Sequence, residues 1–151
     1  MGIESDAVRS WLSVVRAYHL CESVMAQRLA ALGVRLAEHE VLANVLSQPG
    51  ISQQALSARC FSAKSHISAL ISQFEERKLV RREPDPADAR AKQLFLTRTG
   101  EALARKTVAI QSEVIRAMAE SIGDDAQMRL VEAAMDRTSA RLQELLNSPP
   151  R

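Results

Sequence analysis

Residues 74–100 constrain the fold of this 151-residue chain more than any other segment. A charged helix end is followed by a short basic and apolar run, a turn rich in proline and aspartate, and a second apolar run. Proline and aspartate favour turns and do not continue a helix, and the flanking runs have the length of short strands. The order predicts a β-hairpin, with strands at residues 79–82 and 93–96, between two helices.

Composition favours helices for the rest of the chain. Hydrophobic residues make up 46% of the sequence but aromatic residues only 3%, and the abundance of alanine and leucine is typical of helices packed on helices. A chain of this length forms one ordinary domain. The predicted fold class is therefore mainly α, of the α+β type with a small hairpin.

Apolar spacing and capping residues divide the helical part into six segments. Gly33 ends the first as a left-handed residue, Pro49 and Gly50 end the second, and Gly123 ends the fifth. The predicted helices cover residues 5–32, 36–47, 52–59, 62–77, 97–122 and 124–147. Side chains that can cap them, by accepting hydrogen bonds from free amides of the first turn, are Ser52, Ser62, Thr97 and Asp124, the last in a capping box with Gln127.

The third and fourth helices with the hairpin form a winged helix-turn-helix, a unit that usually binds duplex DNA. Between residues 59 and 98 there are nine Lys or Arg against five Asp or Glu, an excess of four, although the whole chain carries only +2. A basic surplus on this unit favours a nucleic-acid partner. The alternative is an ordinary solvated face.

The first, fifth and sixth helices carry apolar stripes that the small middle unit cannot cover. We therefore expect residues 1–34 and 99–147 to be dimerisation helices around a DNA-binding module at 35–98, all in one structural domain, with a frayed tail at 148–151. A two-fold homodimer covers both copies of a self-complementary stripe. The alternative is a monomer that folds its own helices together.

Over nearly its whole length the chain resembles the MarR family of bacterial transcription regulators. The most specific match lies in the wing, where the family has Asp, any residue, Arg, and later Leu-Thr and a Gly. The matching residues are Asp88, Arg90, Leu96, Thr97 and Gly100. The run SQQALSARCFSAKSHISALISQFEERKLVRR is similar to the third and fourth helices of the family and the first strand of its wing.

The resemblance implies an obligate dimer whose two recognition helices enter successive major grooves while the wings reach the flanking minor grooves. Two-fold proteins read half-sites roughly 34 to 36 Å apart, so we expect a pseudo-palindromic operator. Position on the fourth helix and wing indicates the side chains that meet bases or phosphates. These are Ser62, Lys64, Ser65, His66, Ser68, Arg81, Arg82, Arg90 and Lys92.

The chain departs from the family pattern at four positions. Ala69 and Ala89 stand where arginines are frequent, which predicts fewer DNA contacts and a weaker salt dependence. Lys78 replaces a glycine at the end of the recognition helix, so we expect a positive φ or a different helix end there. Arg35 occupies a position where threonine usually caps the second helix, and arginine cannot accept a hydrogen bond.

Family members often release DNA when a phenolic or other anionic compound binds between the dimer helices and the winged module. Arg16 and His19 lie one turn apart on the first helix and can hold a carboxylate, Glu22 interrupts the stripe beside them, and His39 can close the site from the second helix. These four residues are the predicted ligand site. The alternative is a polar edge of the dimer surface.

Other classes of function have weaker support in the sequence. Cys21 and Cys60 lie far apart and are typical of packed thiols in a cytosolic protein, although a cysteine redox sensor remains an alternative. No metal site or cofactor is expected, and the absence of a nucleophile motif or phosphate-binding loop argues against an enzyme.

The predicted function is a homodimeric, ligand-responsive repressor in the bacterial cytoplasm, associated with the nucleoid and not with a membrane. A winged-helix protein-interaction module with weak or lost DNA binding is the alternative.

Overall fold

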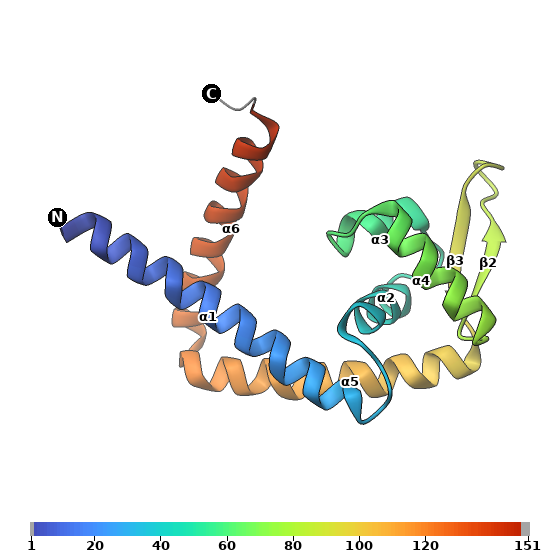
Figure 1. Ribbon diagram of the computed structural model, residues 1–151, viewed down its shortest axis with the longest axis horizontal. Helices are drawn as coiled ribbons and strands as arrows, with labels where there is room; N and C mark the ends of the chain where they lie inside the picture. The colour runs from blue at the N-terminus through green and yellow to red at the C-terminus, as the bar shows by residue number, and fades with distance from the viewer. Residues whose placement is uncertain (1, 149–151) are drawn as a thin grey trace. The chain divides into compact units, whose positions relative to one another are not determined.

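The computed structural model describes the backbone of residues 2–148 and the side chains of residues 6–148. Its elements, in chain order, are α1 (Gly2–Ala30), α2 (Leu36–Ser47), β1 (Ile51–Ser52), α3 (Gln53–Arg59), α4 (Lys64–Glu76), β2 (Val80–Pro84), β3 (Lys92–Leu96), α5 (Arg98–Ile122) and α6 (Asp125–Asn147) (Figure 1). The chain forms two compact units, residues 1–112 and 113–151, and each is described by itself. The predicted class, mainly α with a small antiparallel sheet in a winged helix-turn-helix, is confirmed.

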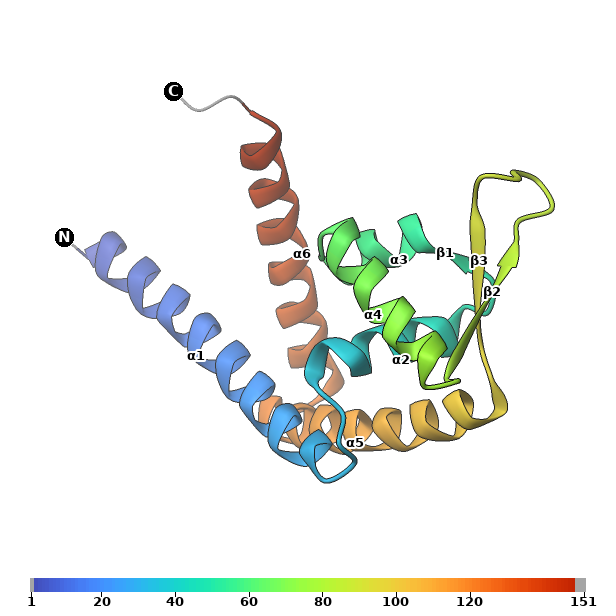
Figure 2. The same cartoon turned by 45° about the vertical axis from the view of Figure 1, so that its right-hand side comes forward.

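The small sheet has three strands in the order β1-β3-β2, all antiparallel. The predicted hairpin is confirmed, with Val80 opposite Leu96 and Pro84 opposite Lys92, and it extends beyond the helices as a wing (Figure 2). The sequence did not predict β1, in which Ile51 pairs with Leu94. Two residues are too few to show the alternation that marks a strand.

The core of the first unit lies where α2, α3 and α4 meet the sheet. Leu56 of α3, Phe74 of α4 and Leu94 of β3 are each at most 1% exposed. Along α4 the buried residues recur at three- and four-residue steps, as the sequence predicted for Ile67, Leu70, Ile71 and Phe74. Because this face of α4 packs in the core, the opposite face of the helix points toward solvent.

Three of the four predicted helix caps are confirmed. The hydroxyl of Ser52 accepts from the amide of Ala55 at 3.1 Å, and that of Thr97 accepts from the amide of Gly100 at 3.0 Å. Asp124 accepts from the amide of Gln127 at 2.9 Å, and the Gln127 side chain accepts in return from the Asp124 amide.

The prediction that Ser62 caps α4 is wrong. The N-cap position belongs to Ala63, which has no capping side chain. Ser62 is held one residue further back because its amide donates to the carbonyl of Ser57, within the turn that ends α3. Closure of the preceding helix therefore decides where α4 begins.

Positive φ angles follow each of α1 to α4, with Gly50 at φ +84° after α2. Gly33 has φ +65°, as expected after α1, and Lys78 has φ +56° after α4, as its place in the sequence predicted. Phe61, after α3, has φ +48° and was not expected to adopt this conformation. At both Phe61 and Lys78 the next amide bonds five residues back, Ser62 to Ser57 and Leu79 to Phe74, in the pattern of a Schellman motif.

Gly100 lets α5 begin directly against the strand that opens the wing. A Cβ atom at this position would lie 1.8 Å from the carbonyl oxygen of Leu79. The same carbonyl accepts from the amide of Thr97 at 3.0 Å. The Thr and Gly of the wing signature thus join the base of the wing to α5 through the backbone.

The apolar stripes of the long helices are only partly covered. In α1, Met25 and Leu29 are buried, but Trp11 is 63% exposed. In the second unit, α6 buries none of its residues. Among the described residues, no helix has the length and apolar character needed to cross a membrane.

Candidate nucleic-acid interface

The outward face of α4 presents an unoccupied set of polar side chains. Lys64, Ser65 and His66 are exposed, while Ser62 and Ser68 are half-buried. Within the described part of the chain, none of these five side chains forms a hydrogen bond or an ion pair. Ser62 lies just before α4 and the other four lie in its first two turns, at the end that enters a major groove in helix-turn-helix proteins.

The missing cap also leaves free amides at this end of α4. The amides of His66 and Ile67 donate to the carbonyl of Ala63, but no side chain accepts from the amides before them. Free N–H groups and the helix dipole together favour an anion at a helix N-terminus. A DNA phosphate is such an anion.

The tip of the wing is ordered by two aspartates. Asp85 accepts from the amide of Ala87 at 2.8 Å, and Asp88 accepts from the amide of Arg90 at 2.9 Å. Each is a side chain bonded to the backbone two residues on, which stabilises a turn. In this chain, therefore, Asp88 of the wing signature shapes the loop that carries Arg90.

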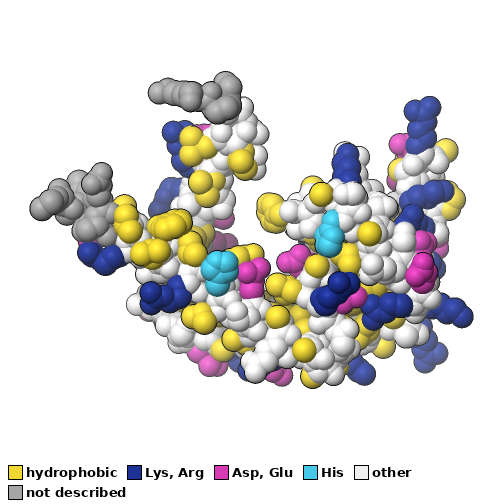
Figure 3. All heavy atoms as spheres, viewed as in Figure 1, with side chains coloured by type: hydrophobic (Ala, Val, Ile, Leu, Met, Phe, Trp, Pro, Cys, Tyr) yellow, Lys and Arg dark blue, Asp and Glu magenta, His cyan; other side chains and the backbone are white. Residues whose placement is uncertain are grey.

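The predicted cations of the interface fall into two groups. Lys64, Arg90 and Lys92 are exposed and have no acidic partner among the described residues. Side chains of Lys and Arg gather around the wing and along the edge of α4 (Figure 3). These three cations are free to meet phosphates.

Arg81 and Arg82 instead interact within the protein. Arg81 forms an ion pair with Glu83 and lies 4.7 Å above the centre of the Phe95 ring. Arg82 contacts Glu75 of α4 at 3.1 Å and donates to Ser72 at 3.2 Å, so it links the wing to the recognition helix. The sequence did not separate them from the free cations, because it does not show that α4 brings Glu75 to Arg82, or that Arg81 pairs with Glu83 of its own strand and does not extend into solvent.

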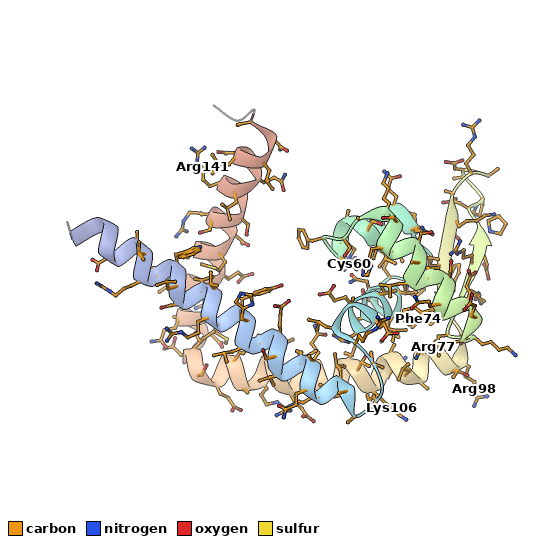
Figure 4. All side chains as sticks on the ribbon, viewed as in Figure 1. Cys60, Phe74, Arg77, Arg98, Lys106 and Arg141 are labelled. Atoms are coloured by element: carbon orange, nitrogen blue, oxygen red, sulfur yellow. The ribbon has the colours of Figure 1, made fainter. Side chains whose placement is uncertain are left out.

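An ion pair between the buried Glu38 and the partly exposed Arg77, which was not predicted, fixes the far end of α4. Glu38 of α2 is 4% exposed and receives a hydrogen bond from Arg77 at 2.7 Å. It also accepts from the amide of Arg35 at 2.8 Å. Arg77 lies beside Phe74 at the end of α4, its guanidinium 5.6 Å from the ring centre (Figure 4).

This carboxylate is charged at neutral pH. Burial opposes ionisation of Glu38, but the hydrogen bonds from Arg35 and the charges of Arg35 and Arg77 outweigh it and lower the pKa. Glu38 lies three positions after Arg35, the spacing of a capping box. The arginine at the N-cap, where Ser or Thr is usual, hid that signal in the sequence.

The four predicted ligand residues are only partly brought together. On α1, His19 lies 3.5 Å from Glu22, which also accepts from the Tyr18 hydroxyl at 2.8 Å. Arg16 is exposed on the same helix and takes no part in this contact. His39 is 2% exposed and its Nδ1 atom has no hydrogen-bond partner among the described residues, so it lies inside the first unit and not at its surface.

The surroundings of these residues are acidic or apolar. Burial lowers the pKa of His39, which is therefore neutral. Burial and the nearby charge of Glu22 raise the pKa of Glu40. Burial and the charge of Glu40 also raise the pKa of the Cys60 thiol, which accepts from the Asn44 amide at 3.6 Å.

A cavity of about 330 Å³ lies between α2 and α5 in the first unit. Ala43, Leu46 and Val108 give it an apolar surface, and Asn44, Ser47 and Gln111 add polar groups. The volume is at the lower end of the range for small-molecule sites. No group of three or more His, Cys, Asp or Glu among the described residues is arranged to hold a metal ion.

Known proteins are similar to this chain in sequence and in fold. A model of the MarR family matches residues 32–91. The transcriptional regulator HosA of Escherichia coli O111:H- is 31% identical over 102 residues, which cover 66% of this chain and 76% of HosA.

Two solved structures are similar in fold. The S. aureus MepR–DNA complex has a TM-score of 0.75 at 19% identity, over 89% of this chain and 97% of MepR. A structure describing the regulation of DNA binding of Bordetella bronchiseptica BpsR by 6-hydroxynicotinic acid has a TM-score of 0.71 at 20% identity, over 87% of this chain and 98% of that one.

Proposed function

The chain belongs to the MarR family of transcriptional regulators, and we propose that it acts as a homodimeric repressor of a pseudo-palindromic operator from which a small ligand releases it. As a member of this family it is a DNA-binding regulator and not an enzyme. The observation that carries the proposal is the outward face of α4, where Lys64, Ser65 and His66 have no hydrogen-bond or ion-pair partner among the described residues. The wing adds Arg90 on a loop ordered by Asp88.

The contacts divide the proposed interface into two kinds of residue. Ser62, Lys64, Ser65, His66, Ser68, Arg90 and Lys92 contact bases or phosphates directly. Arg81 and Arg82 do not contact DNA directly but hold the wing in place, because their guanidinium groups already pair with Glu83 and Glu75. Arg90 enters the minor groove, where a narrow groove concentrates negative potential.

Dimer formation is supported by the exposed stripes. Trp11 and Val8 of α1 are more than half exposed, as are Leu142 and Leu145 of α6. Exposed apolar area of this extent is unusual on a monomer. A two-fold assembly buries the stripe on both copies and sets two recognition helices one helical turn of DNA apart.

The ligand that we propose is a small aromatic acid or phenol, by analogy with BpsR and 6-hydroxynicotinic acid. Arg16 and the imidazole of His19 are the side chains that we propose for binding such an anion, with Glu22 competing for His19. The cavity between α2 and α5 offers a second location with neutral walls. The site on α1 contains an arginine and the cavity between α2 and α5 contains no charged residue, so an anionic ligand and a neutral ligand should prefer different locations.

DNA binding is tested by mobility-shift titration of the full chain with the promoter region beside its own gene, at two salt concentrations. We expect a specific shift that weakens as salt rises. Absence of a specific shift with any upstream fragment would contradict the repressor and favour the alternative, a winged-helix protein-interaction module.

The wing is tested by Arg90→Ala, with Arg105→Ala as the matched control. Arg105 is an exposed arginine of α5 that pairs with Glu101. We expect Arg90→Ala to weaken operator binding about tenfold, with dimer mass and melting temperature unchanged, and the control to bind as wild type. Equal affinity of Arg90→Ala and wild type would contradict the role of the wing.

The ligand is tested by thermal shift with a panel of aromatic acids, on wild type and Arg16→Ala. A ligand held by Arg16 stabilises only the wild type. Equal stabilisation of both proteins would contradict the carboxylate site on α1 and favour the cavity.

The redox alternative has no support from Cys60. A raised thiol pKa means little thiolate at neutral pH, and the thiolate is the reactive form.

A further inference from the structure

Phe61 occupies a backbone position that normally requires glycine. The turn after α3 is a Schellman motif, in which Cys60 donates to Leu56, Phe61 to Ala58 and Ser62 to Ser57. This pattern places its fifth residue in the left-handed region, where glycine is usual. Here that residue is a phenylalanine with φ +48°.

The ring gains nothing from folding of the chain. It is 97% exposed, the highest value among the large apolar side chains of the described residues. A Cβ atom disfavours left-handed backbone, and an exposed ring contributes no hydrophobic stabilisation. A residue that adopts an unfavourable backbone conformation and does not stabilise the folded chain is a candidate for a functional role.

The surroundings of Phe61 point to a polyanion. It lies three residues before Lys64, the first residue of the recognition helix, and two residues after Arg59, another exposed cation. From residue 41 to residue 74 the sequence contains no aspartate or glutamate. The amides at the start of α4 are also free of a side-chain cap.

We propose that Phe61 is a specificity-determining residue of DNA binding, whose ring packs against the C5 methyl group of a thymine at the edge of the major groove entered by α4. A phenyl ring forms no hydrogen bond to a base edge, and the thymine methyl is the apolar group that the major groove displays. The proposal rests on the proposed DNA binding. It adds a preference for thymine at one position of each half-site.

The test begins with an operator selected from a random duplex library by the full wild-type chain. Each thymine of one half-site is then replaced by deoxyuridine, which removes only the C5 methyl, and Kd is measured by fluorescence anisotropy at fixed salt. We expect one replacement to weaken wild-type binding about fourfold, the value of one buried methyl group. Phe61→Gly should bind the parent and the replaced operator equally, which closes a double-mutant cycle.

Phe61→Gly and Phe61→Asn separate the ring from the backbone. Both substituents accept a positive φ, so the melting temperature should be unchanged or higher. Both should bind the parent operator about tenfold more weakly, with dimer mass unchanged. Phe61→Leu, which keeps an apolar side chain, should retain part of the affinity.

Three results would overturn the proposal. Operator binding by Phe61→Gly as tight as that of the wild type would mean that the ring makes no contact with DNA. Persistence of the deoxyuridine effect in Phe61→Gly would assign the methyl contact to another residue. A change of dimer mass in Phe61→Gly would assign the ring to a contact with a second copy of the chain. If the wild type selects no sequence at all, the proposed function fails, and that result is distinct from these three.

Discussion

The winged module and the long helices solve the problem of apolar surface in opposite ways. In the module, α3, α4 and the sheet bury Leu56, Phe74 and Leu94 completely or nearly so. In the second unit, α6 buries none of its residues although Leu142 and Leu145 recur along it at helical spacing. The core of the module is therefore formed within a single chain, whereas the stripe of α6 is exposed and is the surface that the proposed dimer would cover.

The first prediction contrasts a core leucine with a stripe leucine. Leu56→Ala should destabilise the protein by about 4 kcal/mol, because it leaves a cavity in a fully buried site. The measurement is urea unfolding at several protein concentrations. This loss should not depend on concentration, since the module folds within one chain.

Leu142→Ala is the matched variant in the stripe. In a dimer that uses α6, its midpoint should approach that of the wild type as the protein is diluted below the dimer dissociation constant, because the partner chain then stabilises neither protein. A Leu142→Ala effect independent of concentration would remove the contrast between module and stripe.

Much of this contrast was predictable from the sequence. The module was predictable because its signals are local in the sequence. They are the turn residues, the helix caps and the recurrence of apolar residues every three or four positions along α4. The stripes of α1 and α6 were visible for the same reason. β1 and the start of α4 were not predicted correctly. The pairing of Ile51 with Leu94 is a long-range contact, and the hydrogen bond from the Ser62 amide to the Ser57 carbonyl belongs to a Schellman motif in which Phe61 stands in place of the usual glycine.

The sequence indicated which basic and polar residues belong to the candidate interface, but not which of them pair with other residues of the protein. Arg81, Arg82 and Arg90 look alike in the sequence, yet the acids Glu83 and Glu75 engage the first two. Burial of His39 depends on packing around α2 that a single helix pattern does not reveal. Contacts across elements therefore set which side chains remain free for DNA.

The second prediction tests the join between the wing and α5. Gly100→Ala should cost about 3 kcal/mol, because a Cβ atom would lie 1.8 Å from the Leu79 carbonyl oxygen and the backbone must move. Gly33→Ala is the control: φ is +65° there but nothing lies within 4 Å of the added atom. That change should cost about 1 kcal/mol. Equal losses in urea unfolding would show that the close approach is not what requires Gly100.

The third prediction concerns the ion pair at the end of α4. Glu38→Gln should cost about 2 kcal/mol at pH 7, the value of a hydrogen bond to a charged group. The pKa of Glu38 is lowered in the folded state, so its stabilisation is complete above the ordinary pKa of glutamate, about 4.3, and disappears as pH falls through the folded value.

Urea unfolding of wild type and Glu38→Gln between pH 7 and pH 2 measures this difference directly. The two stabilities should converge at the acid end. A constant difference over the whole range would mean that the charge of Glu38 does not contribute, and that Gln loses only packing.

The smallest expected effect separates a serine that caps from one that does not. Ser52→Ala should cost about 1 kcal/mol, because its hydroxyl accepts from the amide of Ala55 at the start of α3. Ser62→Ala should change stability by less than about 0.5 kcal/mol, because Ala63 already holds the N-cap position of α4. If DNA uses the Ser62 hydroxyl, the same variant should bind the operator more weakly while it unfolds as wild type does. Equal stability losses in the two variants would instead mean that Ser62 caps α4. The first amides of α4 would then bond within the protein and would not be free for DNA.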